Sequence, residues 1–170
     1  HNATHLPGAD AAAARSLQSD CGVAVPATID LGNGVIMRLV AIPAGEFVIG
    51  SLDGAADERP RAVARIRKPF RMSITEVTNG QYGQFDPEHD TRYIDMHFMD
   101  HVVPGHIANH KDQPVARISW QEATAFCKWL SEKTGKRVTL PTEAQWEWAA
   151  RAGTASQFYY GDKDTDFGPF

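Results

Sequence analysis

Residues 114–154 read PVARISWQEATAFCKWLSEKTGKRVTLPTEAQWEWAARAGT, and this stretch decides the fold. Ser119 precedes Glu122 by three positions, and Thr142 precedes Gln145 by the same spacing. Each pair predicts a capping box, in which the hydroxyl and the later side chain bond N–H groups at the start of a helix. A glycine follows each apolar pattern, at positions 135 and 153, and glycine is typical of helix ends. The stretch therefore predicts two helices.

Upstream of this stretch, one further capping box and several strands are predicted. Thr78 precedes Gln81 by three, with Val77 and Tyr82 spaced as a hydrophobic staple. Residues 35–50 indicate two strands separated by the turn-forming residues 43–45, and residues 62–77 indicate one strand, or two with a bend near Pro69. Residues 52–60 and the polar, His-rich residues 85–114 indicate loops. Helices and strands in this order predict an α+β fold.

The two ends of the chain differ from this pattern. Asp10 can cap a short Ala-rich helix that ends near Gly22, so residues 1–25 are predicted to be an N-terminal helical extension and residues 26–170 the main domain. The chain is irregular from Tyr159 and stops in a predicted loop, so we expect the domain to be incomplete at its C-terminus. Because residue 1 is His rather than Met, we expect that an upstream segment was removed and that the protein is periplasmic or secreted.

Composition excludes some classes of function. The 170 residues are 42% hydrophobic and 22% charged, and the formal net charge is -4. This balance is typical of a globular protein. No apolar run approaches the ~20 residues that span a bilayer. An acidic chain argues against nucleic-acid binding. The basic residues alternate with apolar ones, which favours a half-solvated strand over a phosphate-binding groove; they are Arg59, Arg61, Arg65, Arg67, Lys68 and Arg71.

Two groups of side chains could hold a metal ion. The first comprises His97 and His101, four apart and on one face if that segment is helical, among the neighbouring histidines and aspartates; these neighbours are His89, His106, His110, Asp90, Asp95 and Asp100. The second comprises Asp162, Asp164 and Asp166, which alternate as in calcium loops but lack the glycine of an EF-hand. The competing interpretations are a polar loop for the first group and a solvated turn for the second.

Three further motifs have a structural interpretation that we favour. The four tryptophans could form a ligand platform, but their spacing beside small apolar residues favours core positions; they are Trp120, Trp129, Trp146 and Trp148. Glu143 and Glu147 are expected on a solvated helix face. Cys127 lies on an apolar helix stripe and is expected to be buried rather than reactive.

The order of these segments resembles the formylglycine-generating (sulfatase-modifying factor) family. IPAGEFVIGS at 42–51 resembles its opening strand pair, ITEVTNGQYGQF at 74–85 its strand-to-helix junction, and residues 114–154 its most diagnostic block. Asp57-Glu58-Arg59-Pro60 resembles the acidic segment between them. The insertion at 86–95 and the N-terminal helix resemble the planctomycete-type bacterial variant.

The resemblance implies a C-type-lectin-like α+β fold, often stabilised by calcium. Complete enzymes of the family oxidise a sulfatase cysteine to formylglycine with oxygen and copper held by two cysteines. That cysteine pair and the calcium-binding segments follow the point where this sequence ends, so no catalytic residue is carried over. Cys127 matches a helix cysteine that pairs with one near the family's C-terminus, and Ala150 stands where relatives often have another.

Three functions remain open for the protein. It is part of a formylglycine-generating oxidase, a non-catalytic lectin-like module that binds protein or glycan, or a relative that acts on another substrate. The expected partner of this chain is the missing C-terminal half or another protein chain.

Overall fold

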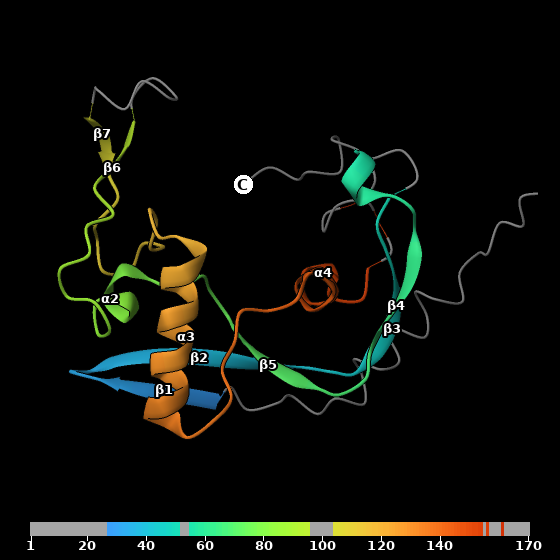
Figure 1. The fold of residues 1–170 in the computed structure, drawn as a ribbon, viewed down its shortest axis with the longest axis horizontal. Coiled ribbons are helices and arrows are strands. Elements are labelled where there is room, and N and C mark those ends of the chain that lie inside the picture. The colour runs from blue at the N-terminus through green and yellow to red at the C-terminus, as the bar shows by residue number, and fades with distance from the viewer. Residues whose placement is uncertain (1–26, 52–54, 96–103, 155, 157–160, 162–170) are drawn as a thin grey trace, which may run out of the picture. The chain divides into compact units, whose positions relative to one another are not determined.

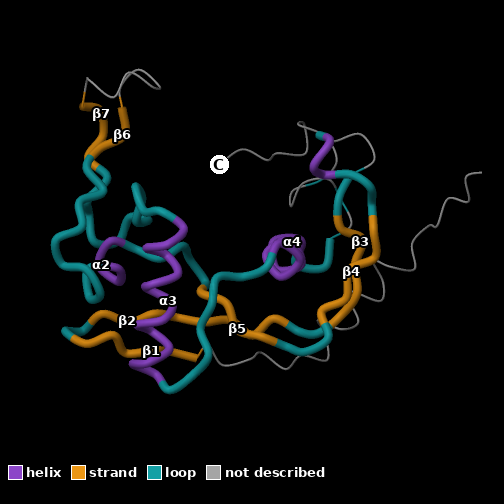
Figure 2. Tube along the Cα trace, in the orientation of Figure 1, coloured by secondary structure: helices purple, strands orange, loops and turns teal. Residues whose placement is uncertain are grey.

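The computed structural model describes residues 27–51, 55–95, 104–154, 156 and 161. Their contacts divide into two compact units. One unit contains residues 27–40 and 71–140, and the other contains residues 41–70 with the C-terminal segment from Pro141. Figure 1 labels the helices and strands, and Figure 2 colours them by type. The predicted helix before residue 25 lies outside the described residues.

The first unit is built on the sheet β1-β2-β5, formed by Ala27–Gly32, Val35–Ile42 and Phe70–Ser73. β1 and β2 pair antiparallel, with Ile29 opposite Met37. Side chains on β1 alternate between more buried and exposed, so one face of the hairpin turns toward a core. Sequence reasoning missed β1, although the Asn33-Gly34 pair at its end is a strong hairpin signal. Both residues have positive φ, 53° and 76°, as a type I′ turn requires.

Two helices contribute the other side of this core. They are α2, Asn79–Tyr82, and α3, Trp120–Thr134. The buried centre consists of Leu31, Met37, Tyr82, Phe126 and Leu130. The Tyr82 and Phe126 rings stack with their centroids 5.5 Å apart. Strand alternation and helical spacing thus place their apolar residues in one cluster.

A two-stranded ribbon lies within the stretch that was predicted to be irregular. β6, Tyr93–Asp95, pairs antiparallel with β7, Pro104–Ile107. Ile94 and Ile107 are 63% and 64% exposed. The ribbon therefore does not bury these isoleucines, and it lacks the half-buried apolar face that typically marks a strand in a sequence.

In the second unit, α4 packs on one face of a β-hairpin. β3, Gly45–Ile49, pairs with β4, Ala62–Ile66, and a short 3₁₀ turn at Ala56–Glu58 lies between them. α4 spans Glu143–Arg151. Trp148 contacts Phe47 with ring centroids 5.4 Å apart, and its indole N–H donates to the Pro43 carbonyl at 2.9 Å. A Cβ on Gly45 would lie 2.7 Å from the Trp148 ring, so this contact requires glycine.

The three predicted capping boxes are all present. Each hydroxyl accepts from the N–H three residues on, and each later side chain accepts from the N–H of the cap residue. α3 ends at Gly135 in the left-handed conformation, as predicted, with φ 65°. α4 ends one residue earlier than predicted, because Ala152 itself adopts the left-handed conformation. None of the described helices combines the length and apolar character needed to cross a membrane.

The predicted core positions of the tryptophans are only partly correct. Trp148 is buried, and Trp129 packs beside the central cluster. Trp120 and Trp146 are 69% and 63% exposed, so their core assignment was wrong. Helical spacing alone did not distinguish the covered face of each helix from the uncovered one.

Candidate functional site

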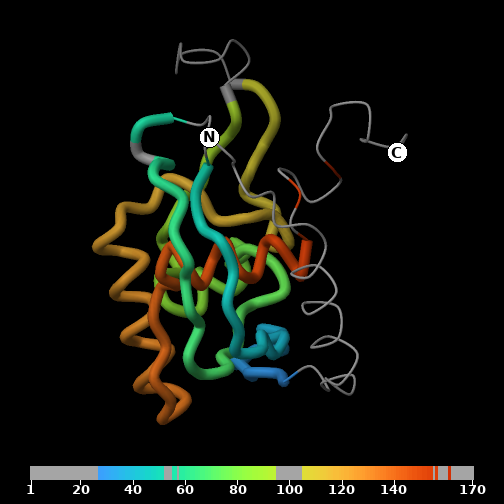
Figure 3. Tube along the Cα trace, turned by 90° about the vertical axis from the view of Figure 1, so that its right-hand side faces the viewer, coloured from blue at the N-terminus to red at the C-terminus, as the bar shows by residue number. Residues whose placement is uncertain are grey.

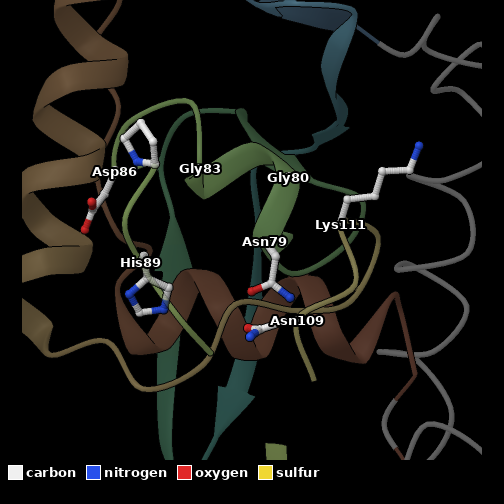
Figure 4. A pocket seen from close by; sticks show the side chains of 8 residues that line it. Asn79, Gly80, Gly83, Asp86, His89, Asn109 and Lys111 are labelled. Carbon is white, nitrogen blue, oxygen red and sulfur yellow. The ribbon is translucent and has the colours of Figure 1, made fainter. Parts of the chain in front are cut away.

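A polar pocket of about 320 Å³ lies between α2 and the loop that carries Asn109 and Lys111 (Figure 4). Gly80 and Gly83 form the α2 side, and Asp86 and His89 follow from the next loop. A Cβ on Gly80 would lie 3.0 Å from the Lys111 carbonyl oxygen. The loop approaches the helix closely because Gly80 has no side chain.

Asn79 joins α2 to this loop through its amide group. Its Nδ2 donates to the carbonyl oxygens of Ala108 at 2.7 Å and His110 at 3.0 Å. Its Oδ1 accepts from the Thr91 hydroxyl at 2.6 Å. Thr91 is 2% exposed, and its Oγ1 also accepts from the Ala116 N–H at 3.2 Å. Both side chains are thus used to hold the backbone rather than presented to a ligand.

His89 occupies the other side of the same network. Its Nε2 lies 2.9 Å from the Ala116 carbonyl oxygen. A carbonyl oxygen only accepts, so Nε2 carries the proton in this contact. The His89 ring also packs edge-on against Tyr82, with centroids 5.0 Å apart. The Thr91 Oγ1 lies 3.4 Å from the same Nε2, and because this hydroxyl is already bonded to Asn79, the three contacts orient the His89 ring.

Two titratable groups near this network have shifted pKa values. The pKa of Asp90 is lowered, first by its hydrogen bond from Asn109 and then by the Arg92 N–H, which donates at 2.8 Å. The pKa of Tyr82 is raised, mainly by burial and then by the carboxylates of Glu122 and Asp86. Both shifts follow from the hydrogen bonds and burial that hold the loop.

A second concavity, of about 480 Å³, follows the side of α3. Its lining includes Trp120, Cys127, Val138 and Leu140. Ser131 shapes its edge, because its Oγ accepts from the Val138 N–H at 2.9 Å. This concavity is more apolar than the Asn79 pocket.

Cys127 is buried, as predicted, and its thiol is free among the described residues. Burial raises the pKa of its thiol. A raised pKa keeps the group protonated at neutral pH, whereas a reactive cysteine or a metal ligand needs the thiolate. Cys21 lies outside the described residues.

Glu147 on α4 does not lie on a solvated face, contrary to the prediction. Its Oε1 accepts from Nε and Nη2 of Arg151, at 2.8 and 2.6 Å. Both side chains are only about a fifth exposed. The i,i+4 spacing was visible in the sequence as an ion pair, but the partial burial depends on packing within the unit.

The implied copper and calcium ions do not fit the residues that the structure describes. Copper held by two thiolates needs two cysteines, and Cys127 is the single cysteine among them. Those residues also contain no group of three or more His, Cys, Asp or Glu that could hold a metal ion. The predicted candidates His97, His101, Asp162, Asp164 and Asp166 lie outside the described residues.

Sequence reasoning missed the Asn79–Thr91 network. The bonded pairs are 12 to 31 residues apart, which local patterns do not relate. Thr78 and Asn79 at the start of α2 do not predict this network, because threonine and asparagine also occur at a helix start as ordinary caps.

Comparison with known proteins places the chain in a family. Residues 33–169 match the Sulfatase-modifying factor enzyme 1-like domain. The chain is 39% identical to the formylglycine-generating enzyme of Mycobacterium tuberculosis, over 76% of this chain and 56% of that protein. It is 30% identical to inactive C-alpha-formylglycine-generating enzyme 2 of Bos taurus, over 79% and 56% respectively. The chain thus spans about half the length of these relatives.

Solved structures agree on the fold. PvdO from Pseudomonas aeruginosa superposes with a TM-score of 0.61 at 26% identity, covering 81% of this chain and 56% of that one. Treponema denticola variable protein 1 has a TM-score of 0.64 at 20% identity, covering 84% and 62%, and shows the fold alone. The fold is the α+β, C-type-lectin-like fold, as the resemblance implied. The chain belongs to the formylglycine-generating, sulfatase-modifying factor family.

Proposed function

We propose that the protein to which this chain belongs is an oxidase that converts a cysteine of a protein substrate to formylglycine. The observation that carries the proposal is the family match over residues 33–169, together with 39% identity to a formylglycine-generating enzyme. In this proposal the chain supplies scaffold: the core around Tyr82 and Phe126 and the loop held by Asn79.

The reacting groups are proposed to lie outside the described residues. Cys127 is buried with a raised thiol pKa, and no second cysteine accompanies it in the described part of the chain. Copper and calcium are therefore proposed for the complete domain only. The remainder of the domain, or another protein chain, is the proposed partner.

The test compares residues 1–170 with the full-length protein. Each is incubated with a sulfatase-type cysteine peptide, copper, oxygen and a thiol reductant, and the peptide is analysed by mass spectrometry. We expect formylglycine from the full-length protein and none from residues 1–170. Product from residues 1–170 alone would refute the scaffold assignment.

The second candidate is a non-catalytic binding module. A relative at 30% identity is named an inactive enzyme, and a 32% identical segment occurs in the serine/threonine-protein kinase pkn1 of Chlamydia pneumoniae. If the full-length protein is folded and loaded with copper but leaves the peptide unreacted, the result would favour the binding module over the oxidase.

A further inference from the structure

The segment 59–68 is a local exception in an acidic chain. It contains five of the 17 lysines and arginines and no acidic residue. The other 160 residues therefore contain 12 basic and all 21 acidic residues. All five basic residues of the segment are exposed; they are Arg59, Arg61, Arg65, Arg67 and Lys68.

The register of the β3–β4 hairpin separates its two faces. Phe47 pairs with Ala64 and lies on the face that Trp148 of α4 covers. Glu46 pairs with Arg65, and Val48 pairs with Val63, so these four lie on the opposite, outer face. Figure 1 and Figure 3 show α4 against the hairpin from two directions.

The outer face combines positive charge with exposed apolar surface. Val63, the second residue of β4, is 72% exposed. Arg61 and Arg67 flank the strand at positions that continue the alternation of Val63 and Arg65. Arg65 pairs with Glu46 at 2.5 Å, while no carboxylate is recorded against Arg61 or Arg67 within the described residues. The stripe therefore keeps unneutralised guanidinium groups.

Among the described strands, β4 is paired along one edge. Its recorded strand partner in the described part of the chain is β3, which occupies one edge. An open strand edge presents N–H and C=O groups to an added strand. Like charges reject a second copy of β4, and the same charges attract an acidic strand.

We propose that the outer face and the other edge of β4 bind an extended, acidic segment of a partner protein. The segment carries carboxylates at alternate positions, because a strand repeats every two residues and the arginines follow the same period. Guanidinium groups suit this role because they bond carboxylates through two parallel N–H groups. The surface is independent of the proposed oxidase chemistry.

The test measures binding of fluorescein-labelled (Glu-Thr)4 to residues 1–170 by fluorescence anisotropy. The first control peptide is (Glu-Pro)4, which has the same charge but loses every second N–H group, and whose prolines hold φ near about −65° rather than at the extended value of a strand. The double variant R61Q/R67Q removes the stripe, and K128Q/K136Q removes two charges from exposed positions elsewhere. Circular dichroism verifies that both variants fold.

We expect (Glu-Thr)4 to bind, R61Q/R67Q to bind it about tenfold more weakly, and K128Q/K136Q to match the wild type. We also expect (Glu-Pro)4 to bind more weakly than (Glu-Thr)4. No binding, or equal loss in both variants, overturns the proposal. Tighter binding of duplex DNA or phosphatidylserine vesicles to the same stripe would overturn the assignment to a protein partner.

Discussion

At the scale of single residues, the Thr91 hydroxyl joins segments that are distant in the sequence. It donates to Asn79 Oδ1 and accepts from the Ala116 N–H, and the side chain is almost fully buried. Leaving a buried polar group without its partner costs more free energy than the hydrogen bond contributes net, because the group cannot bond to water instead. The free energy of unfolding therefore depends on the Thr91 hydroxyl oxygen.

Replacing Thr91 with Val tests this directly. The change keeps shape but leaves Asn79 Oδ1 and the Ala116 N–H without this partner, so we expect a loss of about 1–3 kcal/mol in the free energy of unfolding. Thr124→Val is the matched control, since the Thr124 hydroxyl donates to the Trp120 carbonyl at an exposed site. Its expected cost is within ~0.5 kcal/mol. Equal costs in urea denaturation would contradict the role of Thr91.

At the scale of elements, the start of α3 depends on a charged capping box. Glu122 Oε2 accepts from the Ser119 N–H at 2.6 Å and from the Ser119 hydroxyl at 2.7 Å. These bonds lower the pKa of Glu122, the backbone bond first and the hydroxyl bond second. The equivalent box at α4 uses the uncharged Gln145. We therefore expect acid to weaken the capping box of α3 more than the capping box of α4.

The pH dependence of Glu122→Gln tests the charged box. A carboxyl whose pKa is lowered by folding stabilises the protein above its unfolded pKa, and this stability is lost as pH falls through the folded pKa. We expect the variant to lose less stability than the wild type between pH ~5 and pH ~3, because glutamine does not titrate. Thermal melting across this range measures it. An acid-induced loss equal to that of the wild type would contradict the role of the charged box.

At the scale of the whole molecule, the large apolar side chains of the helices differ in exposure, and Trp120 and Trp146 are the open ones. Phe126 and Leu130 are buried within this chain at 4% and 1% exposure, whereas the two tryptophans are exposed. Residues of this chain thus cover the core around Tyr82. Among the described residues, the large exposed apolar side chains are the two tryptophans and several aliphatic residues.

Acrylamide quenching of residues 1–170 should report this distribution. We expect Trp120→Phe and Trp146→Phe each to reduce the quenchable fraction of the fluorescence, because each removes an indole open to solvent. Trp148→Phe removes a buried indole and should raise that fraction. A Trp120→Phe variant with unchanged quenching would show that Trp120 is covered.

The sequence by itself determined the features that depend on neighbours within a few residues. All three capping boxes formed where Thr78, Ser119 and Thr142 predicted them, since both partners lie within one helical turn. The two strands around residues 43–45 and the bend at Pro69 also follow from local alternation and turn residues. The order of these motifs was enough to predict the family.

Only the tertiary structure decided which of these elements meet. The Thr91–Asn79 bond and the β6–β7 ribbon join residues that no local period relates. The exposure of Trp120 could not be predicted from the sequence either, because apolar residues on two faces of a helix have the same pattern until a neighbouring element covers one face. Local hydrogen bonds and turns act within a few residues, whereas burial depends on every segment that packs nearby, and this is the physical reason for the division.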